Sequence, residues 1–186
     1  MFIGIFILVL YVSIVLHFDG NPNNRDYEHL YQMLGKTEQK EKAFMTFTKH
    51  GKMAGDYLVS KLRVERDSFI KSDVIQIIGL TGCSNCDKQL IFFLYDPDWR
   101  VRFFTVDTLD KLKCKNFLDL LPDIITKDSD ENVKTVAIMM LGKHGSAKEI
   151  TFLEDLFKRS EYQDKKLNTA IESALLKLKS SYKDKE

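Results

Sequence analysis

The sequence predicts an all-α fold in which helical hairpins stack in one direction to form an α-solenoid (α/α superhelix). Three observations support this prediction. Apolar residues recur with the 3.6-residue period of a helix and do not alternate as in a strand. The chain repeats itself at intervals of about 32 residues. Nine Gly and three Pro in 186 residues are too few for a β-sandwich, which needs a turn every ~8–12 residues.

Residues 1–18 form the first element, an apolar segment. No charged side chain lies between Phe2 and Phe18, where the sequence reads FIGIFILVLYVSIVLHF. As a helix, these 17 residues extend about 25 Å, which is close to the ~30 Å hydrocarbon core of a bilayer. We therefore expect residues 2–18 to form one transmembrane anchor.

A cleaved signal segment is the main alternative for this element, and a buried core helix is a weaker one. Signal segments favour a basic residue near the start and small residues at the cleavage point. The first basic residue is Arg25 and the first alanine is Ala43. Both observations favour a retained anchor.

Residues 19–25, with the sequence DGNPNNR, are polar and rich in turn formers, which predicts a linker. The basic residues nearest the apolar segment all follow it, and they are Arg25, Lys36, Lys40 and Lys42. The positive-inside tendency then places the soluble part in the cytoplasm, and cysteines that look free agree with a reducing compartment. A translocated bacterial or ER-lumenal domain is the alternative.

The repeats occupy residues 26–179. The segment Asp96-Pro-Asp-Trp-Arg-Val101 matches Asp128-Ser-Asp-Glu-Asn-Val133 at an offset of 32. Residues 49–62 also match residues 143–156 at an offset of 94, about three periods. A single hairpin cannot bury its apolar face alone, whereas three or more stacked hairpins can.

Each repeat contains two helices. The expected helices are residues 26–34, 38–50, 52–64, 67–80, 84–95, 98–112, 114–126, 130–143, 147–159 and 163–179. Asp98 and Asp130 lie where they can cap the first helices of two units. Glycines follow the first helices of three units, where a left-handed cap is usual, and they are Gly51, Gly82 and Gly145. Residues 180–186 are expected to be a frayed, charged tail.

Residues 96–109 (DPDWRVRFFTVDTL) and 128–142 (DSDENVKTVAIMMLG) resemble HEAT repeats, in particular the short kind first named from phycobilisome lyases. The family pattern is an Asp pair, a Val-Arg step, then a small residue and Leu-Gly. The residues that match it after the Asp pairs are Arg102, Lys134, Ala137, Leu141 and Gly142.

The chain departs from this pattern in two places. Asn168 replaces the basic residue in the last unit, and Phe69-Ile70-Lys71 replaces Val-Arg in the first full unit. The resemblance covers residues 67–159 well, and residues 38–64 and 163–179 more loosely. It implies a right-handed α-solenoid used as a binding or scaffolding surface, and it implies no particular activity.

The motif Cys83-Ser-Asn-Cys86 has the spacing of half a zinc site or of a redox pair. A redox pair needs a βαβ setting, which the sequence does not predict. The turns of successive units carry His50, Cys83, Cys114 and His144. With helices ~8–10 Å apart, His50 and His144 lie roughly 25–30 Å from each other and cannot share an ion. At most Cys83, Cys86 and Cys114 can meet, so we expect partly buried thiols, with no metal site and no disulfide.

Nothing in the sequence points to catalysis. The histidines are His17, His29, His50 and His144, and none forms the His-Glu arrangement of the metal-binding HEAT hydroxylases. With 28 Lys+Arg against 27 Asp+Glu, a net charge of +1, the chain also lacks the excess of positive charge that attracts phosphates. We therefore expect no enzyme activity, no cofactor, no small-molecule substrate and no nucleic-acid partner.

Aromatic residues are the best candidates for a binding surface. Phe92, Phe93 and Tyr95 form a run in one second helix, where core packing is expected to account for two of the three. Trp99, the only Trp, is expected to pack at a helix start, and if it is exposed it becomes a candidate hot spot. The candidate protein-binding residues are therefore Phe92, Tyr95 and Trp99.

These observations predict a non-catalytic scaffold or adaptor, tethered to a membrane, that binds a protein of unknown identity through its solenoid surface. Two alternatives stay open. One is a lyase or lyase-like subunit that resembles the bilin lyases, which predicts a concave pocket lined by convergent polar groups. The other is a nucleic-acid-binding HEAT protein, which predicts a one-sided basic patch.

Overall fold

The computed structural model describes residues 23–83, 86–159 and 165–183, and in these residues it contains helices and no strand. The helices are α2 (Asn24–Leu34), α3 (Thr37–His50), α4 (Lys52–Leu62), α5 (Ser68–Thr81), α6 (Asp87–Leu90), the 3-10 helix η1 (Ile91–Tyr95), α7 (Trp99–Lys111), the 3-10 helix η2 (Lys115–Leu120), α8 (Leu121–Lys127), α9 (Glu131–His144), α10 (Ala147–Lys158) and α11 (Lys165–Lys183).

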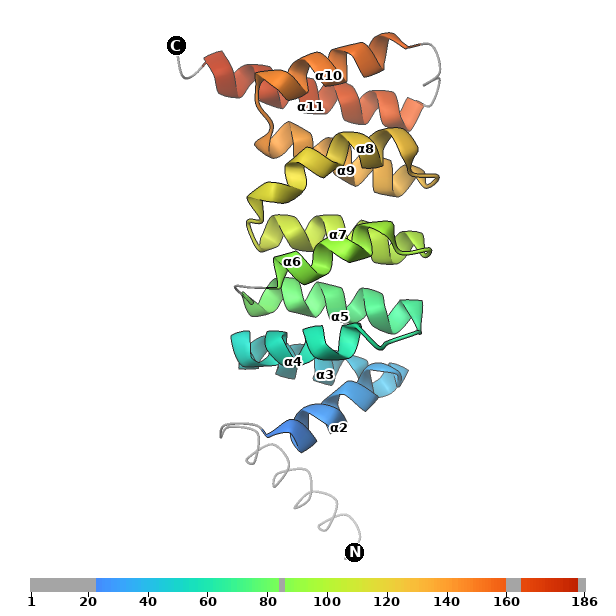
Figure 1. Ribbon diagram of the computed structural model, residues 1–186, viewed down its shortest axis with the longest axis vertical. Coiled ribbons are helices and arrows are strands. Elements are labelled where there is room, and N and C mark those ends of the chain that lie inside the picture. The colour runs from blue at the N-terminus through green and yellow to red at the C-terminus, as the bar shows by residue number, and fades with distance from the viewer. Residues whose placement is uncertain (1–22, 84–85, 160–164, 184–186) are drawn as a thin grey trace, which may run out of the picture.

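The helices stack as hairpins in one direction (Figure 1). The first helices of the units, α3, α5, α7, α9 and α11, contact one another in chain order. The second helices form a second layer, which runs in the same order through α4, α6 with η1, η2 with α8, and α10. The predicted α-solenoid is thereby confirmed for the described residues.

Two predicted helices are each divided in two. The expected helix 84–95 is a short α6 that tightens into η1, a common way for a helix to end. Pro97 disfavours a helical conformation at Asp96, which is extended at φ −61° and ψ 143°. The expected helix 114–126 is η2 followed by α8, because Pro122 has no N–H to donate to the carbonyl four residues earlier.

The helix ends differ from the prediction at several positions. Gly82 is left-handed and Gly51 also has a positive φ of 59°, whereas Gly145 is extended at φ −67° and ψ 176°. Lys113, at φ 57°, takes the left-handed position after α7 instead of a glycine. The predicted linker is too long, since α2 already begins at Asn24 with Asn23 as its cap. The predicted tail is also partly wrong, because α11 continues to Lys183.

Small residues allow neighbouring units to pack closely. A Cβ atom added to Gly142 on α9 would lie 2.7 Å from the Cα atom of Ala174 on α11. Cβ atoms essentially never approach another atom this closely, so α9 and α11 can lie as near to each other as they do because residue 142 is a glycine. The Leu-Gly step of the repeat is therefore a packing requirement.

The predicted membrane segment, residues 1–18, lies outside the described residues. A search of the described helices finds none that is both long and apolar enough to span a bilayer. The anchor is thus neither confirmed nor contradicted by the helices that the structure describes.

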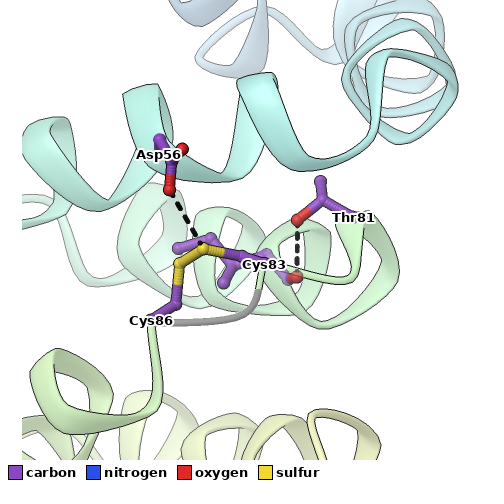
Figure 2. Close-up of a disulfide and its surroundings, with 5 residues drawn as sticks. Asp56, Thr81, Cys83 and Cys86 are labelled. Carbon is purple, nitrogen blue, oxygen red and sulfur yellow. Dashed lines mark hydrogen bonds between the residues drawn. A yellow bond between two sulfur atoms is a disulfide. The ribbon is translucent and has the colours of Figure 1, made fainter.

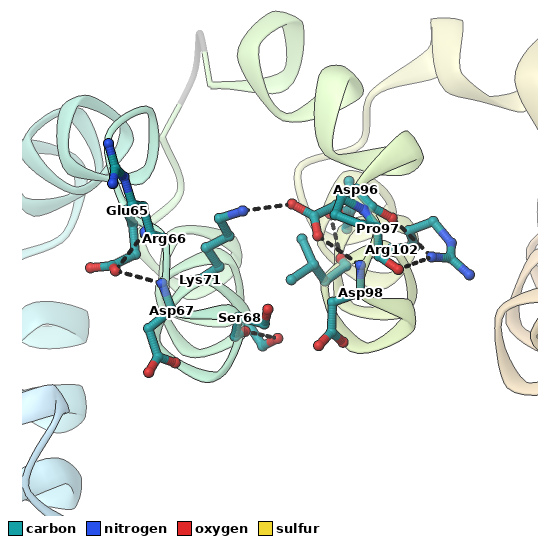
Figure 3. A network of polar contacts seen from close by, with 12 residues as sticks. Glu65, Arg66, Asp67, Ser68, Lys71, Asp96, Pro97, Asp98 and Arg102 are labelled. Atoms are coloured by element: carbon teal, nitrogen blue, oxygen red, sulfur yellow. Dashed lines mark hydrogen bonds and ion pairs between the residues drawn. The ribbon is translucent and has the colours of Figure 1, made fainter.

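A pair of acidic residues at the turns before α7 and α9 connects these units to the previous ones, and Figure 3 shows the pair before α7. The second residue of the pair, Asp98, accepts a hydrogen bond of 2.8 Å from the Arg100 N–H and caps α7. The first residue, Asp96, accepts from the Asp98 N–H at 2.9 Å and from Lys71 Nζ of the previous unit at 2.8 Å. One Asp therefore caps its own helix while the other binds the preceding unit.

The same arrangement recurs in the neighbouring units. Arg102 donates two hydrogen bonds of 2.7 Å to Asp128, which also accepts from the Asp130 N–H, and Asp130 caps α9. At the turn before α5, Glu65 takes the role of the first Asp and accepts from the Tyr31 hydroxyl at 2.6 Å. Lys71, which the family pattern treats as a departure, thus occupies the position that Arg102 has in the next unit.

We predict that breaking the Arg102–Asp128 pair destabilises the fold more than breaking an exposed pair. Both side chains are nearly buried, at 11% and 5% exposure. Arg102→Ala leaves the Asp128 carboxylate without its main partner, and we expect a loss of about 3 kcal/mol in the free energy of unfolding. Arg102→Lys keeps the charge but not the two-pronged geometry, and is expected to fall in between. Urea unfolding followed by circular dichroism measures the loss.

Lys127→Ala is the control for this prediction. Lys127 pairs with Asp123 one turn earlier on α8, where the two side chains are 75% and 43% exposed. Exposed pairs of this kind contribute about 0.5 kcal/mol. Equal losses for Arg102→Ala and Lys127→Ala would contradict the assigned role of the buried pair.

Candidate functional site

η1 presents two aromatic side chains to solvent. Phe92 is 77% exposed and Tyr95 is 60% exposed. A 3-10 helix has three residues per turn, so residues three apart lie on the same side. Leu94 is buried and Phe93 packs partly buried against the core. Of the three aromatic residues, only Phe93 packs against the core, whereas two were expected to do so. We refer to the exposed pair, Phe92 and Tyr95, as the η1 face.

A groove of about 370 Å³ borders the η1 face at Tyr95. It lies between the turn after η1 and helix α8, and its lining includes Pro97, Ile124, Asp123 and Lys127. The buried ion-pair residues Asp96, Arg102 and Asp128 also line it. The groove therefore combines apolar contacts with charges of both signs, and the residues that link the units form part of its lining.

Trp99 begins α7 and is 41% exposed. Beside it, the Arg100 guanidinium lies 3.9 Å from the centroid of the Phe69 ring, in cation–π geometry. Asp98 holds this guanidinium through a hydrogen bond of 3.0 Å from Arg100 Nε. Phe69 is itself 63% exposed, and the sequence reasoning did not select it. Asp67 caps α5 as Asp98 caps α7. Phe69 follows its cap by two residues, as Arg100 does, and this equivalence is the signal in the sequence that points to Phe69.

The sequence pattern also gave no indication of a polar cluster between α2 and α4. Tyr31 donates to Glu65, while the Tyr57 hydroxyl and Lys61 both donate to Glu28. Burial first, and then the neighbouring carboxylates, raise the pKa of Tyr31 and of Tyr57 well above the usual tyrosine range. Both hydroxyls therefore stay protonated donors, and the cluster joins α2 to the first hairpin.

The structure changes the interpretation of the cysteines. Cys83 and Cys86 are buried and joined by a disulfide, so the expectation of free thiols is wrong for this pair and right for Cys114, which is free and buried (Figure 2). The sequence identified Cys114 as the third residue able to meet the pair. The group that converges in the described residues instead contains Asp56, from helix α4, with Cys83 and Cys86.

Cys114 lines a separate pocket of about 470 Å³ with Asp110, Phe117 and His144. Asp110 is nearly buried and pairs with Lys143 at 2.6 Å and with His144. Burial would raise the pKa of Asp110, but hydrogen bonds from Lys143 and His144 hold that pKa below its usual range. Burial and the neighbouring Asp87 raise the pKa of the Cys114 thiol, which keeps it protonated and a weak nucleophile.

Comparison with known proteins supports the repeat assignment. Residues 88–175 match the family model of HEAT repeats, and this range contains both segments that carried the resemblance. A solved crystal structure of an engineered protein, a target of the Northeast Structural Genomics Consortium, superposes with a TM-score of 0.52 at 15% identity. The likeness covers 83% of this chain and 80% of that chain, and at this identity it concerns the fold alone. A search of curated proteins gives no match.

We predict that the carboxylates at the turns make the fold sensitive to acid. The hydrogen bond from Arg100 holds the pKa of Asp98 far below its usual range. Burial would raise the pKa of Asp128, but Arg102 and the Asp130 N–H hold it below its usual range. A carboxyl whose pKa is lower in the folded chain contributes stability above its unfolded pKa, about 3.9 for Asp, and loses it as the pH falls further.

The measurement is the urea midpoint between pH 7 and pH 3. We expect it to change little down to about pH 5 and to fall below about pH 4. Asp128→Asn removes one titrating group and is expected to give a weaker dependence on pH, from a lower starting stability. An unchanged pH dependence in Asp128→Asn would exclude this carboxyl as a cause.

Proposed function

We propose that this helical-repeat protein is a non-catalytic scaffold that binds another protein and that residues 2–18 tether it to a membrane. The observation that carries the binding proposal is the η1 face, where two aromatic side chains are more than half exposed and one of them, Tyr95, borders a groove with charges of both signs. The HEAT-repeat match and the stacked hairpins support it, since such stacks present extended surfaces to partners.

Phe92 and Tyr95 keep most of their apolar ring surface in contact with water. Apolar surface in water is unfavourable by about 25 cal/mol per Å², and these two rings gain little of that energy from the fold. A partner that covers them recovers it, and removal of such an aromatic anchor commonly costs 2 kcal/mol or more of binding energy. Asp123 and Lys127, at the edge of the groove, would then set the register of the partner.

The charges of the described residues favour a protein partner over a nucleic acid. Basic side chains throughout the stack are paired with carboxylates, in the pairs Lys61–Glu28, Lys71–Asp96, Arg102–Asp128, Lys111–Asp107, Lys127–Asp123 and Lys143–Asp110. Phosphate binding gains most from cations that no carboxylate already neutralises. A surface that carries both members of each ion pair is complementary to a protein partner, whose surface also carries charges of both signs.

The lyase alternative requires a pocket with convergent, reactive polar groups. The pocket at Cys114 is the nearest candidate. Its carboxylate, Asp110, is occupied by Lys143 and His144, and its thiol has a raised pKa. We therefore propose no catalytic role for Cys114, and Cys114→Ser is expected to leave partner binding unchanged.

Two observations disagree about the side of the membrane on which the solenoid lies. The basic residues after the apolar segment favour a cytoplasmic solenoid, and we propose that location. The Cys83–Cys86 disulfide removes the support that free thiols gave to a reducing compartment, because disulfides persist mainly in oxidising ones. Protease protection in sealed vesicles distinguishes the two sides.

We predict that the η1 face contacts the partner directly. Replacement of Phe92 by a photo-crosslinking phenylalanine analogue in the full chain should yield a discrete crosslinked protein in the native membrane. Phe92→Ser combined with Tyr95→Ser should lower the yield of the same protein in a pull-down at least tenfold, because both aromatic anchors are lost. Mass spectrometry identifies the partner, and immunoblotting measures its yield.

Phe157→Ser is the matched control. Phe157 is an exposed aromatic residue of the same layer, on α10, with 42% exposure. It should leave the yield unchanged. Equal capture by the Phe92/Tyr95 variant and the native chain, with both folded by circular dichroism, would remove η1 from the proposal.

We predict that the chain stays with membranes after washing at alkaline pH, which releases peripheral proteins, because a helix of about 17 apolar residues is long enough to span the bilayer. A variant that starts at residue 19 should move to the soluble fraction. Release of the full chain by the alkaline wash would contradict a retained anchor and favour a cleaved segment.

A further inference from the structure

Two sulfur atoms and a carboxylate converge where the turn after α5 packs against α4 (Figure 2). Asp56 Oδ1 lies 3.4 Å from Cys83 Sγ. One ligand atom from each of Asp56, Cys83 and Cys86 lies within 4.8 Å of the other two. Both cysteines are buried and Asp56 is exposed, so the group lies at the surface with its sulfur side covered.

Gly55 is what brings the turn this close to α4. A Cβ atom at this position would lie 2.6 Å from Thr81 Oγ1 and 2.7 Å from Cys83 Cβ, so a side chain at residue 55 would push the turn away. Asp56 is the next residue along α4. The glycine thus allows an approach that places a carboxylate of one unit against the CxxC motif of the next.

The contact between Asp56 and Cys83 is not a hydrogen bond while the disulfide is intact. A disulfide sulfur carries no proton, so it cannot donate to the Asp56 carboxylate. After reduction the Cys83 thiol can donate to Asp56. Once the two cysteines ionise, three anionic ligand atoms face one another, and a cation between them is the arrangement that relieves their repulsion.

We propose that the chain in its reduced form binds one Zn²⁺ ion through Asp56, Cys83 and Cys86. The CxxC spacing is that of protein zinc sites, and thiolate sulfur with carboxylate oxygen is a ligand set that Zn²⁺ accepts. A tetrahedral centre with Zn–S bonds of about 2.3 Å and a Zn–O bond of about 2.0 Å places sulfur and oxygen about 3.5 Å apart. The distance in the structure is 3.4 Å.

The two sulfur atoms have to separate for this site to form. In the same tetrahedral centre they lie about 3.8 Å apart, against about 2.0 Å in a disulfide. The Cα atoms of Cys83 and Cys86 are 5.7 Å apart, and rotation of the two side chains supplies the change. Three protein ligands leave the fourth position of the ion to water.

The zinc site and the disulfide are therefore alternative states of the same two cysteines. A dithiol reductant supplies two electrons and two protons, opens the Cys83–Cys86 bond and becomes a disulfide itself. Zn²⁺ then displaces the two thiol protons. In the reverse direction, a disulfide oxidant such as oxidised glutathione takes two electrons from the thiolates and two protons from water, the Cys83–Cys86 bond closes, and Zn²⁺ leaves.

The test uses the full chain in detergent, purified under a phosphine reductant, loaded with zinc sulfate and freed of loose metal by gel filtration. Elemental analysis should find one zinc per reduced chain, and none after treatment with oxidised glutathione. Co²⁺ in place of Zn²⁺ should give the intense visible bands of a tetrahedral site with thiolate ligands. Cys83→Ser and Cys86→Ser should each abolish stoichiometric binding.

Asp56→Asn is the decisive variant, because Asp56 is exposed and its replacement does not disturb the core. This substitution should weaken zinc affinity by at least roughly ten- to a hundredfold. Removal of an outer-shell partner of a metal site already causes a loss of this size, and Asp56 is proposed as a direct ligand. Cys114→Ser is the matched control and should still bind one zinc, since Cys114 lies outside the cluster. Circular dichroism confirms that each variant is folded.

Any of three results would overturn the proposal. One is a reduced chain that holds no more zinc than folded Cys83→Ser. Another is an affinity that Asp56→Asn leaves unchanged, which would mean that any bound metal uses the cysteines without this carboxylate. Loss of zinc from Cys114→Ser would equally exclude the assigned ligand set.

Discussion

A helical hairpin of this chain cannot cover its own apolar face, and every other feature of the structure depends on the next hairpin covering it. The stacked first helices bury residues such as Val74, Val101 and Val133 completely. Apolar burial is not directional, however, and by itself it allows one hairpin to slide along another. The acidic pairs at the turns remove that freedom, because each one holds a side chain of the preceding unit at a fixed position.

The same stacking explains where chemistry gathers. A turn of one unit packs beside a helix of the preceding unit, so residues about one repeat apart come into contact. Asp56 and Cys83 are 27 residues apart, and Arg102 and Asp128 are 26 apart. Groups with no relation in the local sequence thus form a carboxylate–sulfur cluster at one turn and a buried ion pair at another.

The second layer is less regular than the first, and that irregularity shapes the surface proposed for binding. Pro97 ends one second helix, and its last turn tightens into η1. The tightening aligns Phe92 with Tyr95, and the turn at Pro97 forms one side of the neighbouring groove. The η1 face and the CxxC cluster lie in the same unit, toward the two ends of the segment from Cys83 to Tyr95, and neither shares a residue with the other.

Apolar periodicity, Asp caps and small residues at fixed spacing are local properties, so the class of fold, the period and most helix positions can be predicted from the sequence alone. The sequence also selected Phe92 and Tyr95 as candidates, since an aromatic run in a helix points to more than one face, whereas the exposure of both residues follows from the 3-10 helix that the structure shows. The residue that joins the cysteines is visible only in the folded chain, because Asp56 reaches Cys83 through the close packing that Gly55 permits between units. The role of Lys71, which replaces Arg102 in its unit, likewise depends on a contact between units, because its partner Asp96 lies in the next repeat. The CxxC motif is local, but its spacing fits a disulfide as well as a pair of metal ligands, and the folded structure shows the disulfide.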